Sequence, residues 1–173
     1  MIRSARLPAL LVVLAATAPA AFANGWQPLT NQPNANASTL YLLMDGRVLM
    51  NDYWSTKWWI LTPDASGSYL NGTWSAAHNS HDDRLYYASS VLADGRVLVA
   101  GGEYSNTGGG SAAEIYNPVK DLWRPIGIPA GWNYVGDAPS TLLADKRFFL
   151  GNLQDNRTAF WDPVTKAWVA GPT

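Results

Sequence analysis

Apolar runs alternate with short polar hinges from residue 39 to the end of the chain, and the pattern repeats about every fifty residues. The segment LLMDGRVLM at positions 42–50 recurs as VLADGRVLV at 91–99 and as LLADKRFFL at 142–150. The aspartates of these hinges are 49 and 51 residues apart. Each hinge separates two apolar runs that have the length of short β-strands. The pattern therefore predicts an all-β chain built from three repeats.

Each repeat is interpreted as four strands, a to d. Strand a covers Thr39–Met44, Ser89–Ala93 and Ser140–Ala144, and strand b covers Arg47–Met50, Arg96–Ala100 and Arg147–Leu150. The Asp-Gly pairs between them, at 45–46 and 94–95, predict tight type I′ hairpins, which need two residues at positive φ. Lys146 replaces the glycine in the third repeat, so we expect a looser hairpin or another turn type there.

Strand c of each repeat is predicted to end at a proline, because proline cannot donate a hydrogen bond within a sheet. The three prolines are Pro63, Pro118 and Pro163. Strand d follows and is centred on a tryptophan, at Trp74, Trp123 and Trp168. The repeats are thus residues 39–77, 89–127 and 140–173.

Residues 24–38 are expected to form a closing strand and a linker. Gly25–Leu29 resembles Leu122–Ile126, which is a predicted strand d. A ring-shaped repeat protein can close in this way, when the first segment completes the last repeat. Residues 1–23 have the pattern of a secretory signal: Arg3 and Arg6, then an apolar stretch, then a small-x-small cleavage site at 21–23. They predict a secreted or periplasmic protein with no membrane contact after signal cleavage.

Charge and composition narrow the choice of partners. Loss of residues 1–23 removes Arg3 and Arg6 and leaves 10 basic against 13 acidic residues, a net charge of −3. No basic stripe suits a nucleic acid, and no nucleic-acid partner is expected. The chain has no cysteine, so its stability has to come from packing, to which nine tryptophans and eight tyrosines contribute large side chains.

The run LADGRVLVAGGE at 92–103, the run SAAEIYNP at 111–118 and Trp123 together resemble kelch repeats of the galactose oxidase-like β-propeller superfamily. WWILTPD at 58–64 and GSYLNGTW at 67–74 resemble a branch of that group whose members mostly lack an assigned activity. The resemblance implies a kelch-type β-propeller with about three four-stranded blades. A propeller usually needs four to eight blades, so the ring is expected to be incomplete, as in the N-terminal portion of a longer protein.

Galactose oxidase itself implies a copper site that includes a cysteine crosslinked to a tyrosine. This chain has no cysteine, and that cofactor cannot form from it. No cofactor is therefore expected. Copper enters only under the alternative that the chain is the N-terminal part of a galactose-oxidase-like copper enzyme.

The b–c and d–a loops of a kelch blade project on one face, where we expect a ligand to bind. The candidate residues on this loop face are Tyr53, Trp54, His78, His81, Asp82, Glu103, Tyr104, Trp132, Tyr134 and Asp155. Exposed aromatic rings suit stacking on sugar rings, but each ring can also serve as an anchor that fills the gap between two blades. Both interpretations stay open.

His78 and His81 are the chain's two histidines, and Asp82 and Asp83 follow them closely. These four side chains have the chemistry of zinc or copper ligands. Nothing in the sequence fixes both imidazoles around one point, so the favoured interpretation is a polar solvated loop without a metal and without catalytic residues.

The sequence thus favours a non-catalytic, exported propeller segment that binds a glycan or a protein through the loop face. The alternatives are the copper enzyme described above and a structural or degenerate propeller fragment with no activity of its own. Three blades leave two sheet faces open. We therefore expect self-association, or further blades from a longer chain.

Overall fold

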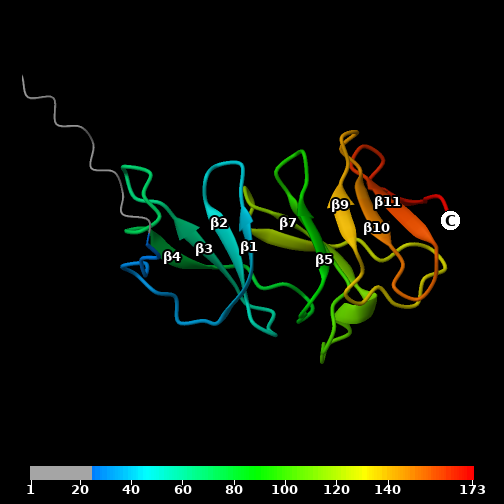
Figure 1. Cartoon of the computed structure of the whole chain (residues 1–173), viewed down its shortest axis with the longest axis horizontal. Helices are drawn as coiled ribbons and strands as arrows, with labels where there is room; N and C mark the ends of the chain where they lie inside the picture. The colour runs from blue at the N-terminus through cyan, green and yellow to red at the C-terminus, as the bar shows by residue number, and fades with distance from the viewer. Residues whose placement is uncertain (1–24) are drawn as a thin grey trace, which may run out of the picture.

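The computed structural model describes residues 25–173, so the predicted signal peptide and the predicted mature start at Asn24 lie outside the described residues. Twelve strands form three antiparallel four-stranded sheets, which lie side by side in a row (Figure 1). This arrangement confirms the predicted all-β fold and its three four-stranded blades. No helix within the described residues is long and apolar enough to cross a membrane.

The strands follow chain order within each blade. The first blade contains β1 (Ala37–Leu42), β2 (Val48–Asp52), β3 (Trp58–Thr62) and β4 (Thr73–Ala77). The second contains β5 (Ala88–Val91), β6 (Val97–Ala100), the short 3-10 helix η1 (Gly109–Ser111), β7 (Ala113–Asn117) and β8 (Leu122–Pro125). The third contains β9 (Ser140–Leu142), β10 (Phe148–Gly151), β11 (Thr158–Asp162) and β12 (Ala167–Ala170).

Two sequence signals mark the strand ends as predicted. β3, β7 and β11 each stop at the residue before a proline, and β4, β8 and β12 each contain the expected tryptophan. Figure 1 shows the hairpins between the first two strands of each blade at one end of the sheets and η1 at the other. The loops between the second and third strands therefore lie opposite these hairpins.

The predicted type I′ hairpins are wrong. Gly46 has φ 84° and Gly95 has φ 83°, but the aspartates before them are not in the positive-φ region. The amide of Gly46 donates to the carbonyl of Leu43, so the turn contains Met44 and Asp45 and is followed by one left-handed residue. This is the three-residue hairpin loop with a G1 bulge, which needs positive φ at one position instead of two.

The third hairpin is not looser, contrary to expectation. Lys146 has φ 72°, and its amide donates to Leu143 with the same geometry as Gly46 in the first blade. In all three hairpins the arginine two residues after the aspartate binds back to it with its backbone amide and its guanidinium, in the pairs Asp45–Arg47, Asp94–Arg96 and Asp145–Arg147. These local bonds hold the lysine hairpin in the shape that glycine adopts in the other two.

Two apolar layers hold the blades together. Leu49, Trp58 and Ile60 of the first blade pack against Val97, Val99, Tyr116 and Trp123 of the second. Leu98, Ala100 and Ile115 of the second blade pack against Phe148, Leu150 and Trp161 of the third. Because both faces of β6 are covered, all four of its residues are buried, as its continuous apolar sequence predicts.

Each outer-strand tryptophan ties its blade to the segment that precedes it. The indole N–H donates to a backbone carbonyl about one repeat earlier: Trp74 to Asn31, Trp123 to His78 and Trp168 to Gly127. Residues 25–36 form no strand, and Trp26 is fully exposed. The described residues contain no further blade that could receive this segment, so the closing strand stays a prediction.

The outer faces of the first and third sheets are only partly covered by the described residues. On the first blade Met50 and Leu61 share the face of Leu40 and Leu42 but are 1% and 5% exposed. Leu40 and Leu42 are 56% and 63% exposed on the first blade. On the third blade Phe149, Phe160 and Val169 are neighbours across β10, β11 and β12, on the face opposite Phe148 and Leu150. Apolar surfaces of this kind normally have a partner.

Candidate ligand-binding site

Three loops meet at the end of the molecule opposite the hairpins. They are residues 53–57 between β2 and β3, residues 78–87 between β4 and β5, and residues 101–112 between β6 and β7. Isolated β-bridges join Ser55 to Arg84 and Leu85 to Glu103, and the amide of Glu103 donates to the carbonyl of Leu85 over 2.6 Å. The backbone thus fixes loops of two different blades against one another.

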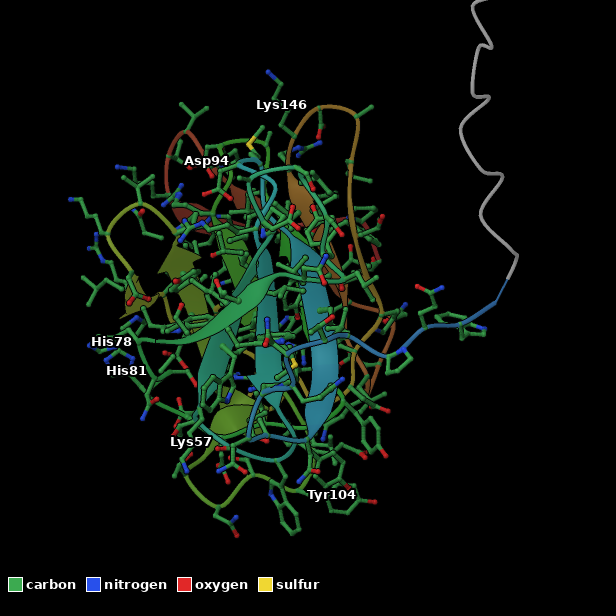
Figure 2. The ribbon with its side chains drawn as sticks, turned by 90° about the vertical axis from the view of Figure 1, so that its left-hand side faces the viewer. Lys57, His78, His81, Asp94, Tyr104 and Lys146 are labelled. Atoms are coloured by element: carbon green, nitrogen blue, oxygen red, sulfur yellow. The ribbon has the colours of Figure 1, made fainter. Side chains whose placement is uncertain are left out.

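Three exposed aromatic residues follow these bridges, and we call Trp54, Tyr86 and Tyr104 the aromatic triad. Their exposed fractions are 45%, 58% and 63%. The centre of the Tyr104 ring lies 6.4 Å from that of Trp54 and 6.3 Å from that of Tyr86, and both contacts are edge-to-face. Figure 2 shows Tyr104 and Lys57 at the same end of the molecule, opposite Asp94 and Lys146. The triad is therefore part of the predicted loop face.

All three residues of the aromatic triad have a left-handed backbone. Their φ angles are 48°, 50° and 54° for Trp54, Tyr86 and Tyr104. An aromatic residue in this region costs about 1–3 kcal/mol and persists only where its surroundings hold it, as they often do at binding sites. Since each strained residue adjoins a residue of a bridge, the bridges supply that restraint.

A shallow hollow of about 220 Å³ lies beside the triad. Its walls include Tyr104, Tyr134 and the hydroxyl-bearing residues Ser105 and Ser111. Gly102, Gly108 and Gly110 complete the lining. A Cβ added to Gly110 would come 2.5 Å from the Tyr134 ring, so glycine is needed there for the ring to lie where it does.

A buried ion pair lies below this surface. The Arg84 guanidinium and the Glu114 carboxylate are both fully buried and 2.6 Å apart. Arg84 also donates to the carbonyl of Gly101 over 2.7 Å, and His81 donates its amide to Glu114 over 2.9 Å. These bonds connect the 78–87 loop with β7 and with the start of the 101–112 loop.

Burial alone would raise the pKa of Glu114. The hydrogen bonds from His81 and the charge of Arg84 outweigh this effect and hold the pKa of Glu114 below its ordinary value. Glu114 is therefore ionised at neutral pH and neutralises the buried guanidinium.

Asp83 holds the part of the 101–112 loop that follows Tyr104. Its carboxylate accepts hydrogen bonds from the hydroxyls of Ser105 and Thr107, at 2.8 and 2.7 Å, and from the amide of Asn106 at 2.9 Å. Burial raises the pKa of Asp83, but these bonds more than compensate and lower it well below the ordinary value. Asp83 is thus a structural residue of the loop.

Some of the candidate residues predicted from the sequence come together and others do not. Trp54 and Tyr104 are both in the triad, and Tyr53 is exposed beside it. Figure 2 places His78 and His81 at the side of the molecule, away from Tyr104. No group of three or more His, Cys, Asp or Glu side chains within residues 25–173 has the arrangement of a metal site.

The remaining candidates have structural contacts. Trp132 is buried in the layer between the second and third blades. Asp155 is paired with Arg157, Glu103 bridges to Leu85 through its backbone, and Asp82 lies 3.8 Å from Arg84. For Trp132 the anchoring interpretation holds.

Tyr86 was not predicted. It follows the polar segment at 78–84 and precedes Tyr87 and the apolar strand β5, so its sequence context resembles that of a residue entering the core. Only the left-handed backbone turns its side chain outward. The sequence does contain one signal for an exposed ring here, namely two adjacent tyrosines just before a strand. Tyr87 is partly buried and packs against the core, so Tyr86 is left to point outward.

No protein-family model matches the chain, and no curated protein sequence matches it. Solved structures do. The structure of YjhT superposes with a TM-score of 0.59 at 16% identity, covering 83% of this chain and 53% of that one. A catalytically inactive variant of virginiamycin B lyase from Staphylococcus aureus with quinupristin superposes with a TM-score of 0.56 at 15% identity, covering 84% and 43%.

These neighbours support the β-propeller fold and nothing more specific, because the identities are low. A fungal alcohol oxidase of the AA5 family in complex with copper matches with a TM-score of 0.40 and carries no argument here. This chain spans about half the length of YjhT and less than half of the lyase.

Proposed function

We propose that the chain is part of an exported kelch-type propeller that binds a glycan through the aromatic triad and the adjoining hollow. The single observation that carries the proposal is the triad itself: three exposed rings in mutual contact, all held in a left-handed backbone. Rings that merely fill a gap between blades need neither the exposure nor the strain. The surface is already ordered, which lowers the entropic cost of binding.

The chemistry of the surface suits a sugar better than a purely apolar ligand. Aromatic faces stack on the C–H face of a pyranose. The hydroxyls of Ser105 and Ser111 and the phenol of Tyr134 beside the triad are able to bond to sugar hydroxyls. A protein ligand is the alternative partner, since tyrosine and tryptophan are also frequent in protein interfaces.

Additional blades are part of the proposal. The exposed Leu40 and Leu42 on the first blade and the partly exposed Phe149 and Phe160 on the third favour a partner, either further blades of a longer chain or a second copy of this one. Neither the copper-enzyme alternative nor the inert-fragment alternative has a specific observation in its favour among residues 25–173. Binding of a glycan by the aromatic triad requires no catalytic residue and no cofactor.

The test is a glycan array followed by calorimetry on the best ligand. Trp54→Ala and Tyr104→Ala should each weaken binding by about fivefold, because each removes a stacking surface worth on the order of 1 kcal/mol. Trp26→Ala is the matched control, since Trp26 is exposed and lies outside the triad. Circular dichroism checks that the variants fold.

A blank array with folded protein would contradict glycan binding. Equal losses in Trp54→Ala and Trp26→Ala would contradict the role of the triad while leaving glycan binding itself intact.

A further inference from the structure

A second concave surface lies between the second and third blades, away from the aromatic triad. It is a groove of about 590 Å³ whose lining includes four basic residues, Arg96, Lys120, Arg124 and Lys166, and no acidic residue. The protein as a whole carries a net charge of −1. The positive charge of the groove is thus local, and a groove of one sign concentrates ligands of the other.

The fold brings these cations together from distant parts of the chain. Arg96 belongs to the β5–β6 hairpin, Lys120 to the β7–β8 turn, Arg124 to β8 and Lys166 to the β11–β12 turn. Lys166 has φ 56°, a conformation that a lysine rarely adopts. No run of basic residues in the sequence marks the site.

Neighbouring acids neutralise the groove only in part. Among the described residues Arg96 pairs with Asp94, whereas Lys120, Arg124 and Lys166 have no ion pair. Asp121, next to Lys120, accepts from the Tyr116 hydroxyl at 2.7 Å and from the His78 amide at 2.9 Å, on the side of the first blade.

The polar side chains in the wall of the groove are donors. Trp161 also lines the groove, but its indole N–H is buried and is not a contact for a ligand. Asn117, also in the lining, uses its side-chain oxygen for the amides of Val119 and Lys120, so its N–H groups are the ones left for a ligand. Every available polar group of the groove is therefore a donor.

The groove also has an apolar component, which includes Ile115, Leu122 and Ile126. A bare inorganic anion makes no use of such a surface. We propose that this groove, the inter-blade cationic groove, binds an organic polyanion: a molecule with a sugar or apolar body and at least two carboxylate or sulfate groups. The acidic groups contact the cations of the groove. The proposal does not depend on the function of the triad.

The experiment is titration calorimetry of the full chain at low ionic strength with two probes, trigalacturonate for carboxylates and a heparin-derived tetrasaccharide for sulfates. Maltotriose and inorganic phosphate are the neutral and inorganic comparisons. We expect saturable binding of at least one polyanion, and the stronger of the two identifies the acidic group. Maltotriose should not bind to the groove, and phosphate should bind at least tenfold more weakly.

Two double variants test the location. The double variant Arg124→Gln, Lys166→Gln should weaken polyanion binding at least tenfold. The control Lys57→Gln, Lys146→Gln removes the same charge elsewhere and should change it less than twofold.

Equal losses in the two double variants, no saturable binding of either polyanion, or equal affinity for maltotriose or phosphate would each overturn the proposal.

Discussion

Glu114 is the residue whose loss should damage the candidate site most directly, although it touches no ligand surface. The change Glu114→Leu removes the carboxylate that neutralises Arg84. The guanidinium, which is 0% exposed, then keeps only the more distant carboxylate of Asp82 at 3.8 Å. It also removes the acceptor for the His81 amide. Breaking a buried ion pair in this way costs about 3–5 kcal/mol.

This loss of stability corresponds to a measurable change in the melting temperature. For a domain of this size 1 kcal/mol changes the melting temperature by roughly 2–4 °C, so Glu114→Leu should melt roughly 6–20 °C lower. Urea unfolding followed by tryptophan fluorescence gives the free energy independently, and an unchanged m-value shows that the unfolding unit is the same.

The companion variants separate charge from packing. Arg84→Met should also destabilise, because Glu114 then becomes the buried unpaired charge. The double variant Arg84→Met, Glu114→Leu removes both charges and should lose less than the sum of the two single losses. Strict additivity, or a Glu114→Leu protein as stable as the wild type, would refute the view that this pair holds the 78–87 loop against the second blade.

Three further outcomes are expected. Trp123→Ala should cost about 3–5 kcal/mol, because the ring is 2% exposed and packs 4.6 Å from Trp58; thermal unfolding checks this, and a loss no larger than that of the less buried Trp168→Ala would contradict it. Lys146→Gly should gain about 0.5–1 kcal/mol by relieving a lysine at φ 72°, whereas Gly46→Ala should lose stability; destabilised Lys146→Gly would show that the left-handed lysine is not strained. The folded-state pKa of Asp83 lies well below 3.8, so its contribution to the free energy of unfolding is complete above about pH 5 and is lost as the pH falls through the folded-state pKa. When the free energy of unfolding is measured against pH, Asp83→Asn should therefore lose less stability in acid than the wild type. The same loss in both proteins would contradict this.

The sequence determined the strand plan of this protein because strand and turn signals are local. The Asp-x-Arg hinges, the prolines after β3, β7 and β11 and the outer-strand tryptophans act within a few residues or within one repeat. They give the number of blades and the strand bounds to within about two residues. The turn type was mispredicted because the same Asp-Gly pair fits two hairpin loops, and the choice depends on how many residues lie between the paired strand ends.

The candidate site was only partly predictable. Trp54 and Tyr104 were identified because aromatic residues in loops are conspicuous, but Trp132 has the same appearance in the sequence and is buried. Whether an aromatic side chain in a loop is exposed depends on which residues of the neighbouring blades pack against it. That information is not contained in the neighbouring residues.

Only the tertiary structure decided which side chains act together. Arg84 and Glu114 are thirty residues apart, and their pairing follows from how the 78–87 loop crosses the edge of the second blade. The left-handed backbone at Trp54, Tyr86 and Tyr104 and the four cations of the inter-blade cationic groove have the same origin. Backbone sterics disfavour positive φ in aromatic residues, and like charges repel one another. Packing between blades therefore has to impose both features. The repeats specify the blades, and contacts between blades specify the surfaces.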